Sequence, residues 1–79
     1  MPSDNAYAKI GMRIRELRKE RHMTQDDLAR EINLMGMEMT KLIISRIEKN
    51  QRHVCDGELK ILAKALGVTM EWLCSDGEE

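Results

Sequence analysis

The chain has 79 residues, a formal net charge of −1, 42% hydrophobic residues and 34% charged residues. This composition is typical of one small globular domain spanning residues 1–79, and it excludes a disordered chain of low hydrophobicity. No apolar run approaches the ~20 residues that a membrane-spanning helix needs, so we expect no membrane partner. The polar start of the chain lacks the basic and apolar regions of a signal peptide, and we therefore expect a cytoplasmic protein.

The chemistry-bearing residues do not form a metal site or a catalytic motif. Cys55 and Cys74 are the only cysteines, and neither lies in a Cys-x-x-Cys pair. His22 and His53 add no ligand-like spacing. We therefore expect free thiols, no metal and no cofactor. Without a nucleophile–base motif or a glycine-rich phosphate loop, we expect no enzyme, and so small a domain has little room for a ligand pocket of ~300 Å³.

The charges are unevenly distributed, which matters more for nucleic-acid binding than their sum. Between Lys41 and His53 there are four bases and one acid, whereas acids gather in residues 26–31 and 76–79. A nearly neutral protein can thus carry one basic face. The alternative is that a small helical protein shows such imbalances by chance.

The first predicted helix runs from about Asn5 to Arg21. Ser3 or Asp4 can cap its start. Gly11 weakens the helix, which suggests a close helix–helix contact there. Its apolar stripe recurs at helical spacing and consists of Tyr7, Ile10, Ile14 and Leu17.

The second predicted helix starts at Thr24, which with Asp27 resembles a capping box. It fades between Asn33 and Gly36, and its inner face is formed by Leu28, Ala29 and Ile32. The methionine-rich stretch that follows, residues 34–39, is predicted to be a loop whose Met37 or Met39 enters the core. The alternative reading of this stretch is a methionine metal site or peptide site.

Three further helices complete an all-α pattern without strand signals. Thr40 caps a helix through about Lys49, with Ile44 and Ile47 inward, and a polar loop over residues 50–55 follows. Asp56 is expected to cap a fourth helix, which ends at Gly67 as a C-cap. The stripe of the fourth helix is Leu59, Leu62, Ala63 and Leu66. Thr69 caps a short fifth helix with Trp72 and Leu73, and residues 75–79 are expected to fray, which leaves an ordered core of about 5–74.

The order of these features carries more information than any one of them. Thr24-Gln25 opens a helix with Leu28-Ala29, a capped helix then ends Ile44-Ser45-Arg46-Ile47-Glu48, and a basic loop precedes the run from Leu62 to Thr69. From Ile10 to Leu73 the chain resembles the phage-repressor (Cro-type, XRE-type) helix-turn-helix family. The resemblance implies a compact, all-α, five-helix lambda-repressor-like domain. It also implies a function, that of a sequence-specific DNA-binding transcriptional repressor that binds a two-fold operator as a homodimer.

The resemblance also implies roles for single residues. In the third helix, the residues expected to contact DNA bases are Lys41, Leu42, Ser45 and Arg46. The residues expected to contact DNA phosphates are Gln25, Thr40, Lys49, Asn50, Arg52 and His53. Gln25 would also brace the recognition helix, or alternatively be only a helix-start residue. Arg46 and Lys49 could instead form a solvated face, and Leu42 could mark a protein-contact surface.

Two more expectations follow from the resemblance. Arg18 and Glu48 are expected to form a structural salt bridge between the first and third helices. The connection between helices two and three exceeds the usual turn by about five residues, Met35 to Met39, and the chain looks closest to a family subset with a similar insertion. This insertion bears on how deeply the third helix enters the groove.

An alternative function is a protein-interaction module of the same fold, an antitoxin-like or anti-repressor partner with little DNA binding of its own. The apolar pair Leu42-Ile43, the methionines and the nearly neutral charge favour it. Dimer contacts are expected from this domain itself, with Trp72, Cys74, Leu66 and Met70 as candidates. For Trp72, packing in the core is the preferred reading.

Overall fold

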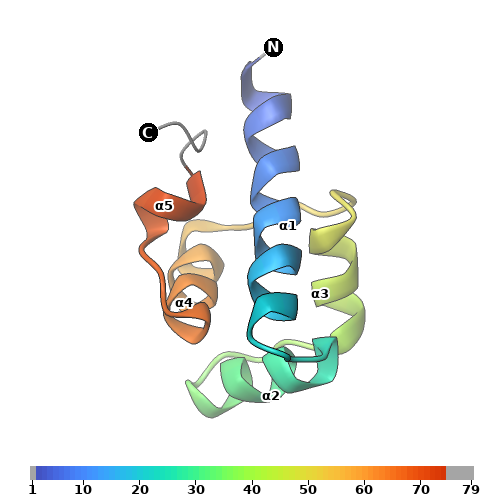
Figure 1. Cartoon of the computed structure of the whole chain (residues 1–79), viewed down its shortest axis with the longest axis vertical. Helices are drawn as coiled ribbons and strands as arrows, with labels where there is room; N and C mark the ends of the chain where they lie inside the picture. Colours follow the sequence, from blue (N-terminus) through green and yellow to red (C-terminus); the bar gives the residue numbers. More distant parts are fainter. Residues whose placement is uncertain (1, 75–79) are drawn as a thin grey trace.

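The computed structural model describes residues 2–74, and side chains from residue 10 onward. Within this range the chain is all-helical, as predicted, with α1 Pro2–Glu20, α2 Gln25–Leu34, α3 Lys41–Glu48, α4 Asp56–Leu66 and α5 Met70–Cys74. Figure 1 shows α1 along the long axis of the molecule, α3 and α4 on either side of it, and α2 across one end. None of the described helices is long and apolar enough to cross a membrane.

The helix ends follow local capping chemistry. The Asp27 N–H donates to Thr24 Oγ1 (3.0 Å) and the Thr24 N–H donates to Asp27 Oδ2 (2.9 Å), which confirms the capping box. The Trp72 N–H donates to Thr69 Oγ1 (3.0 Å), and Gly67 ends α4 at a φ of 76°, a left-handed conformation that favours glycine. Sequence patterns thus located most helix ends correctly, because these hydrogen bonds are local.

Two predicted helix starts are wrong. The first helix begins at Pro2 rather than near Asn5, so Ser3 and Asp4 lie inside it rather than at its start. The fourth helix has Cys55 as its N-cap, whose N–H donates to Glu58 Oε1 (3.1 Å), and Asp56 is already helical. The Tyr7 side chain and the expected fraying of residues 75–79 lie outside what the structure describes.

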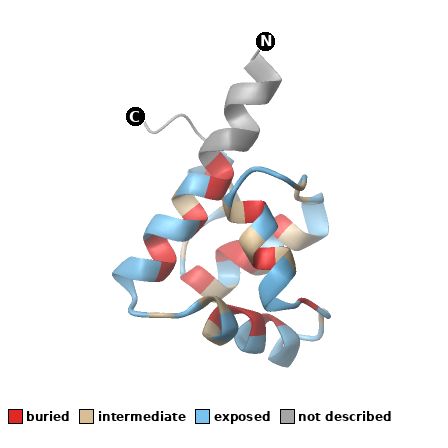
Figure 2. Ribbon diagram, turned by 90° about the vertical axis from the view of Figure 1, so that its right-hand side faces the viewer, coloured by how far each residue is buried: buried red, intermediate tan, exposed pale blue. Residues whose placement is uncertain are grey.

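One hydrophobic core lies between the helices, and Figure 2 marks in red the segments of the described helices that are buried. Met39 is buried and Met37 packs partly against the core, as predicted for the methionine-rich connection. Gly11 lies where α1 meets the end of α3, and a Cβ there would overlap the Ile47 carbonyl oxygen, so the predicted close contact is confirmed. The core consists of Ile10, Ile14, Leu17, Leu28, Ala29, Ile32, Met39, Ile44, Ile47, Leu59, Leu62, Ala63, Leu66 and Leu73.

Trp72 does not pack in the core, contrary to the sequence-based reading. Its side chain is 45% exposed, and the Arg13 guanidinium lies 4.6 Å from the centre of its ring. Arg13 also donates to the Trp72 carbonyl oxygen. Leu73, the next residue, takes the fully buried position, because a five-residue helix has only a narrow inner face. Trp72 therefore joins α1 to α5 from the outside.

Candidate nucleic-acid interface

Helix α3 is anchored on one side and exposed on the other. The Ile43 N–H donates to Thr40 Oγ1 (3.2 Å), which caps the helix as predicted, and Ile44 and Ile47 are buried. At this spacing the positions 41, 42, 45 and 46 share the opposite face. Lys41, Leu42 and Arg46 are exposed there, and Ser45 is half-buried. This face offers two cations, a hydroxyl and an apolar side chain to a partner.

The two cations of that face have no ionic partner among the described residues. Lys41 and Arg46 make no ion pair in the part of the chain that the structure describes. Donors of this kind match the O6 and N7 acceptors of guanine, and the exposed Leu42 matches a thymine methyl group. The arrangement has the chemistry of a helix that reads base edges.

The longer connection between α2 and α3 is held in place. Asn33 Nδ2 donates to the carbonyl oxygens of Ala29 and Met39, both at 2.7 Å. Met39 is buried, and Gly36 takes a φ of 101°, which allows the chain to turn. Helices α2 and α3 still pack directly against each other. The insertion therefore lengthens the turn without separating the two helices.

A buried ion pair joins α1 to the end of α3. Arg18 Nε donates to Glu48 Oε2 (2.7 Å) and Arg18 Nη2 donates to Glu48 Oε1 (3.0 Å), the bidentate geometry that arginine and carboxylate favour. Arg18 Nη1 also donates to the Met23 carbonyl oxygen (2.9 Å). The hydrogen bonds that Arg18 donates to Glu48 raise the pKa of Arg18, so the guanidinium stays charged. The pair locks the orientation of α3 relative to α1.

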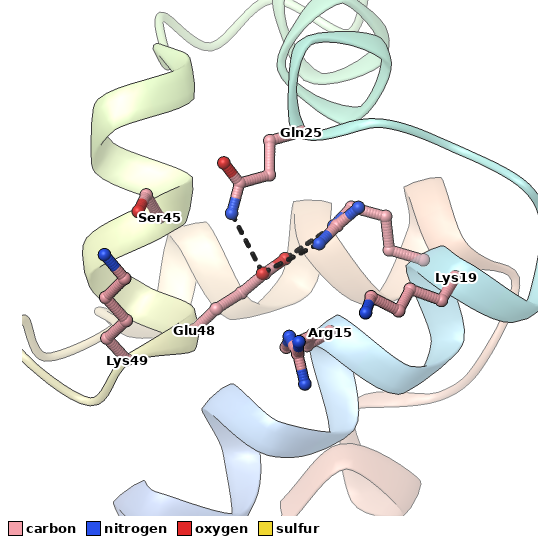
Figure 3. A pocket seen from close by; sticks show the side chains of 7 residues that line it. Arg15, Lys19, Gln25, Ser45, Glu48 and Lys49 are labelled. Carbon is pink, nitrogen blue, oxygen red and sulfur yellow. Dashed lines mark hydrogen bonds and ion pairs between the residues drawn. The ribbon is translucent and has the colours of Figure 1, made fainter.

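Gln25, the first residue of α2, completes this cluster. Its Nε2 donates to Glu48 Oε1 (3.1 Å), as Figure 3 shows, so the side chain braces the end of α3. An amide nitrogen carries two hydrogens, and the second is not used within the described residues. Gln25 can therefore brace α3 and still donate to a phosphate.

Around this cluster lies an open hollow of about 530 Å³ that the sequence analysis did not identify. Its rim carries Arg15 and Lys19 from α1 and Lys49 from just after α3. No role for Arg15 or Lys19 was predicted from the sequence. The sequence shows that these two cations lie one helical turn apart, with Arg18 between them. It does not show that the end of α3 lies beside them, so the hollow could not be predicted.

The loop after α3 also contains predicted phosphate contacts, and among them Arg52 is paired with an acid. Arg52 donates from Nη1 and Nη2 to the two oxygens of Glu58, each at 2.9 Å, and its Nη1 also donates to the His53 carbonyl oxygen (3.2 Å). The Arg52 guanidinium lowers the pKa of Glu58. Asn50 has a left-handed φ of 62°, and a small hollow is lined by Asn50, Gln51, Arg52 and His53. Arg52 is thus placed to shape this loop.

Two thiols and several large apolar side chains are exposed among the described residues. Cys55 and Cys74 are free and exposed. Leu34 is 77% exposed and Leu42 is 57% exposed, on either side of the insertion. Among the described residues, His, Cys, Asp and Glu side chains do not gather in groups that could hold a metal ion.

Comparison with known proteins agrees with this geometry. A helix-turn-helix family model matches residues 14–73, which begin in the second half of α1 and end within α5. No curated protein and no solved structure matches the chain. The matched segment includes α2, α3 and the elements that support them, and it covers most of the sequence. The chain therefore belongs to the Cro- and XRE-type helix-turn-helix family of DNA-binding regulators.

Proposed function

We propose that the chain is a transcriptional repressor of the cytoplasm that reads the major groove of double-stranded DNA with α3. The observation that carries this proposal is the exposed face of α3, which presents Lys41, Leu42 and Arg46 while its other face is buried. Lys41 and Arg46 bind guanine edges, Leu42 contacts a thymine methyl group, and Ser45 donates to an adjacent acceptor. Repression then requires only that the bound domain occupies its operator.

Phosphate contacts set the register of α3 on the duplex. Gln25 and Thr40 lie at the starts of α2 and α3, and Lys49, Asn50 and His53 follow the end of α3. These positions flank the exposed face of α3, where a helix-turn-helix meets the sugar–phosphate backbone. Arg52, because it is paired with Glu58, holds the loop in shape and contributes less direct contact.

The second part of the proposal is that the domain binds a two-fold operator as a homodimer. Of the expected dimer contacts, Leu66 is fully buried and is not available, whereas Trp72 and Cys74 in α5 are exposed and Met70 is half-buried. Met12 on α1 is also exposed. Helices α1 and α5 pack against each other, so dimer contacts made by these two helices would leave α3 free for DNA. Half-sites would lie about one DNA turn, roughly 34 Å, apart.

Selection of bound duplexes from a random pool tests the whole proposal. A two-fold motif is expected, with affinity that falls steeply as salt rises. Lys41→Ala and Arg46→Ala should each cost about 1–3 kcal/mol and relax the preference at one base position. Lys60→Ala, an exposed lysine on α4, is the matched control. Absence of any salt-dependent DNA binding by the wild type would refute the proposal.

A protein-interaction module is the second candidate, and one observation favours it. Leu34, Met35 and Leu42 are large hydrophobic residues that remain exposed near the connection between α2 and α3. If this surface binds a protein, Leu42→Asp abolishes binding of that partner, and Lys41→Ala and Arg46→Ala are silent. If α3 reads DNA, the two cation variants lose DNA specificity instead.

A further inference from the structure

We propose that Asn33, the next-to-last residue of α2, is a positioning residue that fixes the first turn of α3 and so determines how Lys41 and Leu42 read bases. Asn33 has this role only if α3 reads DNA, so the inference rests on the proposed function. It extends that function by giving the longer connection between α2 and α3 a part in sequence preference.

The Asn33 side chain joins the two ends of the connection. Its Nδ2 donates to the Ala29 carbonyl oxygen, one turn earlier in α2, and to the Met39 carbonyl oxygen, both at 2.7 Å. An amide nitrogen has two hydrogens, so these two bonds use its full capacity. The bond to Ala29 holds the side chain against α2. The bond to Met39 fixes the peptide group that leads into Thr40, the N-cap of α3.

The first turn of α3 is mostly exposed. Lys41 and Leu42 face solvent, and the fully buried side chains of the helix begin at Ile44. An open hollow of about 370 Å³ lies beside this turn and is lined by Asn33, Glu38, Met39, Thr40 and Ile43. Side-chain packing therefore fixes the first turn less firmly than the rest of the helix. The hydrogen bonds of Asn33 matter correspondingly more for its position.

The other end of α3 is fixed independently of Asn33. Glu48, the last residue of the helix, accepts two hydrogen bonds from Arg18 and one from Gln25. Arg46 belongs to this end of α3. Loss of the Asn33 bonds should therefore let the first turn move while the last turn stays in place. Because base contacts depend on exact geometry, only the bases read by the first turn should lose preference.

Base preference at single positions of the selected duplex tests the inference. Kd ratios for singly substituted duplexes give the preference at each position, and Lys41→Ala and Arg46→Ala identify the positions that these two residues read. Asn33→Ala loses both bonds but keeps a strong helix former. We expect its preference at the Lys41 position to fall about fivefold, the effect of about one hydrogen bond, with the Arg46 position unchanged.

Two more variants separate the clamp from charge and from general effects on α2. Asn33→Asp keeps the shape of the side chain without its donors and should reproduce the pattern of Asn33→Ala. Glu31→Gln, an exposed residue of the same helix, is the control and should leave both positions unchanged. The inference is overturned if Asn33→Ala weakens both positions equally, if it weakens neither, or if Lys41→Ala identifies no position.

Amide hydrogen exchange tests the clamp without DNA. The Ile43 N–H donates to Thr40 Oγ1 (3.2 Å) in the first turn, and the Lys49 N–H donates to the Ser45 carbonyl oxygen (3.0 Å) at the other end. Asn33→Ala should speed exchange of the Ile43 amide about fivefold and leave that of Lys49 unchanged. Equal acceleration at both amides would indicate a general loss of stability.

The outcomes separate the role of Asn33 from the function on which it rests. If Asn33→Ala changes exchange only in the first turn but the wild type does not bind DNA, the clamp exists and the proposed function fails, together with the reading role of Asn33. If the wild type binds DNA and Asn33→Ala weakens all positions equally, Asn33 only stabilises the domain, and DNA reading by α3 stands. Unchanged exchange of the Ile43 amide would refute the clamp itself.

Discussion

Replacing Arg18 by methionine tests the coupling of α1 to the recognition helix. Methionine keeps the length of the side chain but removes its charge and every hydrogen-bond donor. The Glu48 carboxylate would then stay buried with one remaining donor, Gln25, and the Met23 carbonyl oxygen would lose its bond to Arg18. The side chains of Arg18 and Glu48 are only 9% and 3% exposed, so water reaches the orphaned carboxylate poorly.

The expected loss is large for so small a domain. Removing one partner of a buried ion pair costs about 3–5 kcal/mol. A domain of this length is stable by roughly 4–12 kcal/mol, from about 0.05–0.15 kcal/mol per residue. Each kcal/mol corresponds to about 4–8 °C in a domain of this size, so Arg18→Met should lower the melting temperature by at least about 12 °C. Loss of DNA affinity follows from the smaller folded fraction and from a loosened α3.

Thermal and urea unfolding followed by circular dichroism measure this loss. Arg15→Met is the control, because Arg15 is exposed one turn earlier on α1, and its effect should stay within about 0.5 kcal/mol. The double variant Arg18→Met/Glu48→Met removes both charges and should recover most of the stability. A wild-type melting temperature for Arg18→Met would refute the reasoning, and a double variant no more stable than Arg18→Met would show that the buried charge is not the cause.

Three further predictions follow from local geometry. Gly11→Ala should destabilise the protein by about 1–3 kcal/mol in urea unfolding, because its Cβ meets backbone, whereas Gly57→Ala, with open space around it, should be neutral or stabilising. The Arg52 guanidinium holds the pKa of Glu58 in the folded protein below its ordinary value of 4.5. The ion pair therefore stabilises the fold fully at a pH above 4.5, and this stabilisation is lost as the pH falls through the lowered pKa of the folded state. The difference in unfolding free energy between wild type and Glu58→Gln should therefore shrink in acid, and a difference that grows would contradict the assignment. Thr24→Ala should lower the free energy of unfolding by about 0.5–2 kcal/mol, because the helix cap is lost, and this should be seen as a lower melting temperature. An unchanged melting temperature would show that the cap does not stabilise the protein.

Much of the helical architecture follows from the sequence because its causes are local. The capping box at Thr24 and the glycine that ends α4 act within a few residues, so residue types at fixed spacing predict them. The error at Asp56 has the same origin. Both Cys55 and Asp56 precede the apolar stripe of α4, and the hydrogen bond from Cys55 N–H to Glu58 decided which one is the cap. A sequence pattern defines such a boundary only to within a residue or two.

The tertiary structure alone decided which side chains meet. Trp72 was expected in the core and is exposed, because the neighbouring Leu73 takes the buried position that the short α5 provides. The basic hollow joins Arg15 and Lys19 to Lys49, which is thirty residues or more away in the sequence and comes close only when α3 packs on α1. Helical periodicity records which face of each helix is apolar. It does not record which helix lies opposite, and surfaces formed between helices depend on that packing.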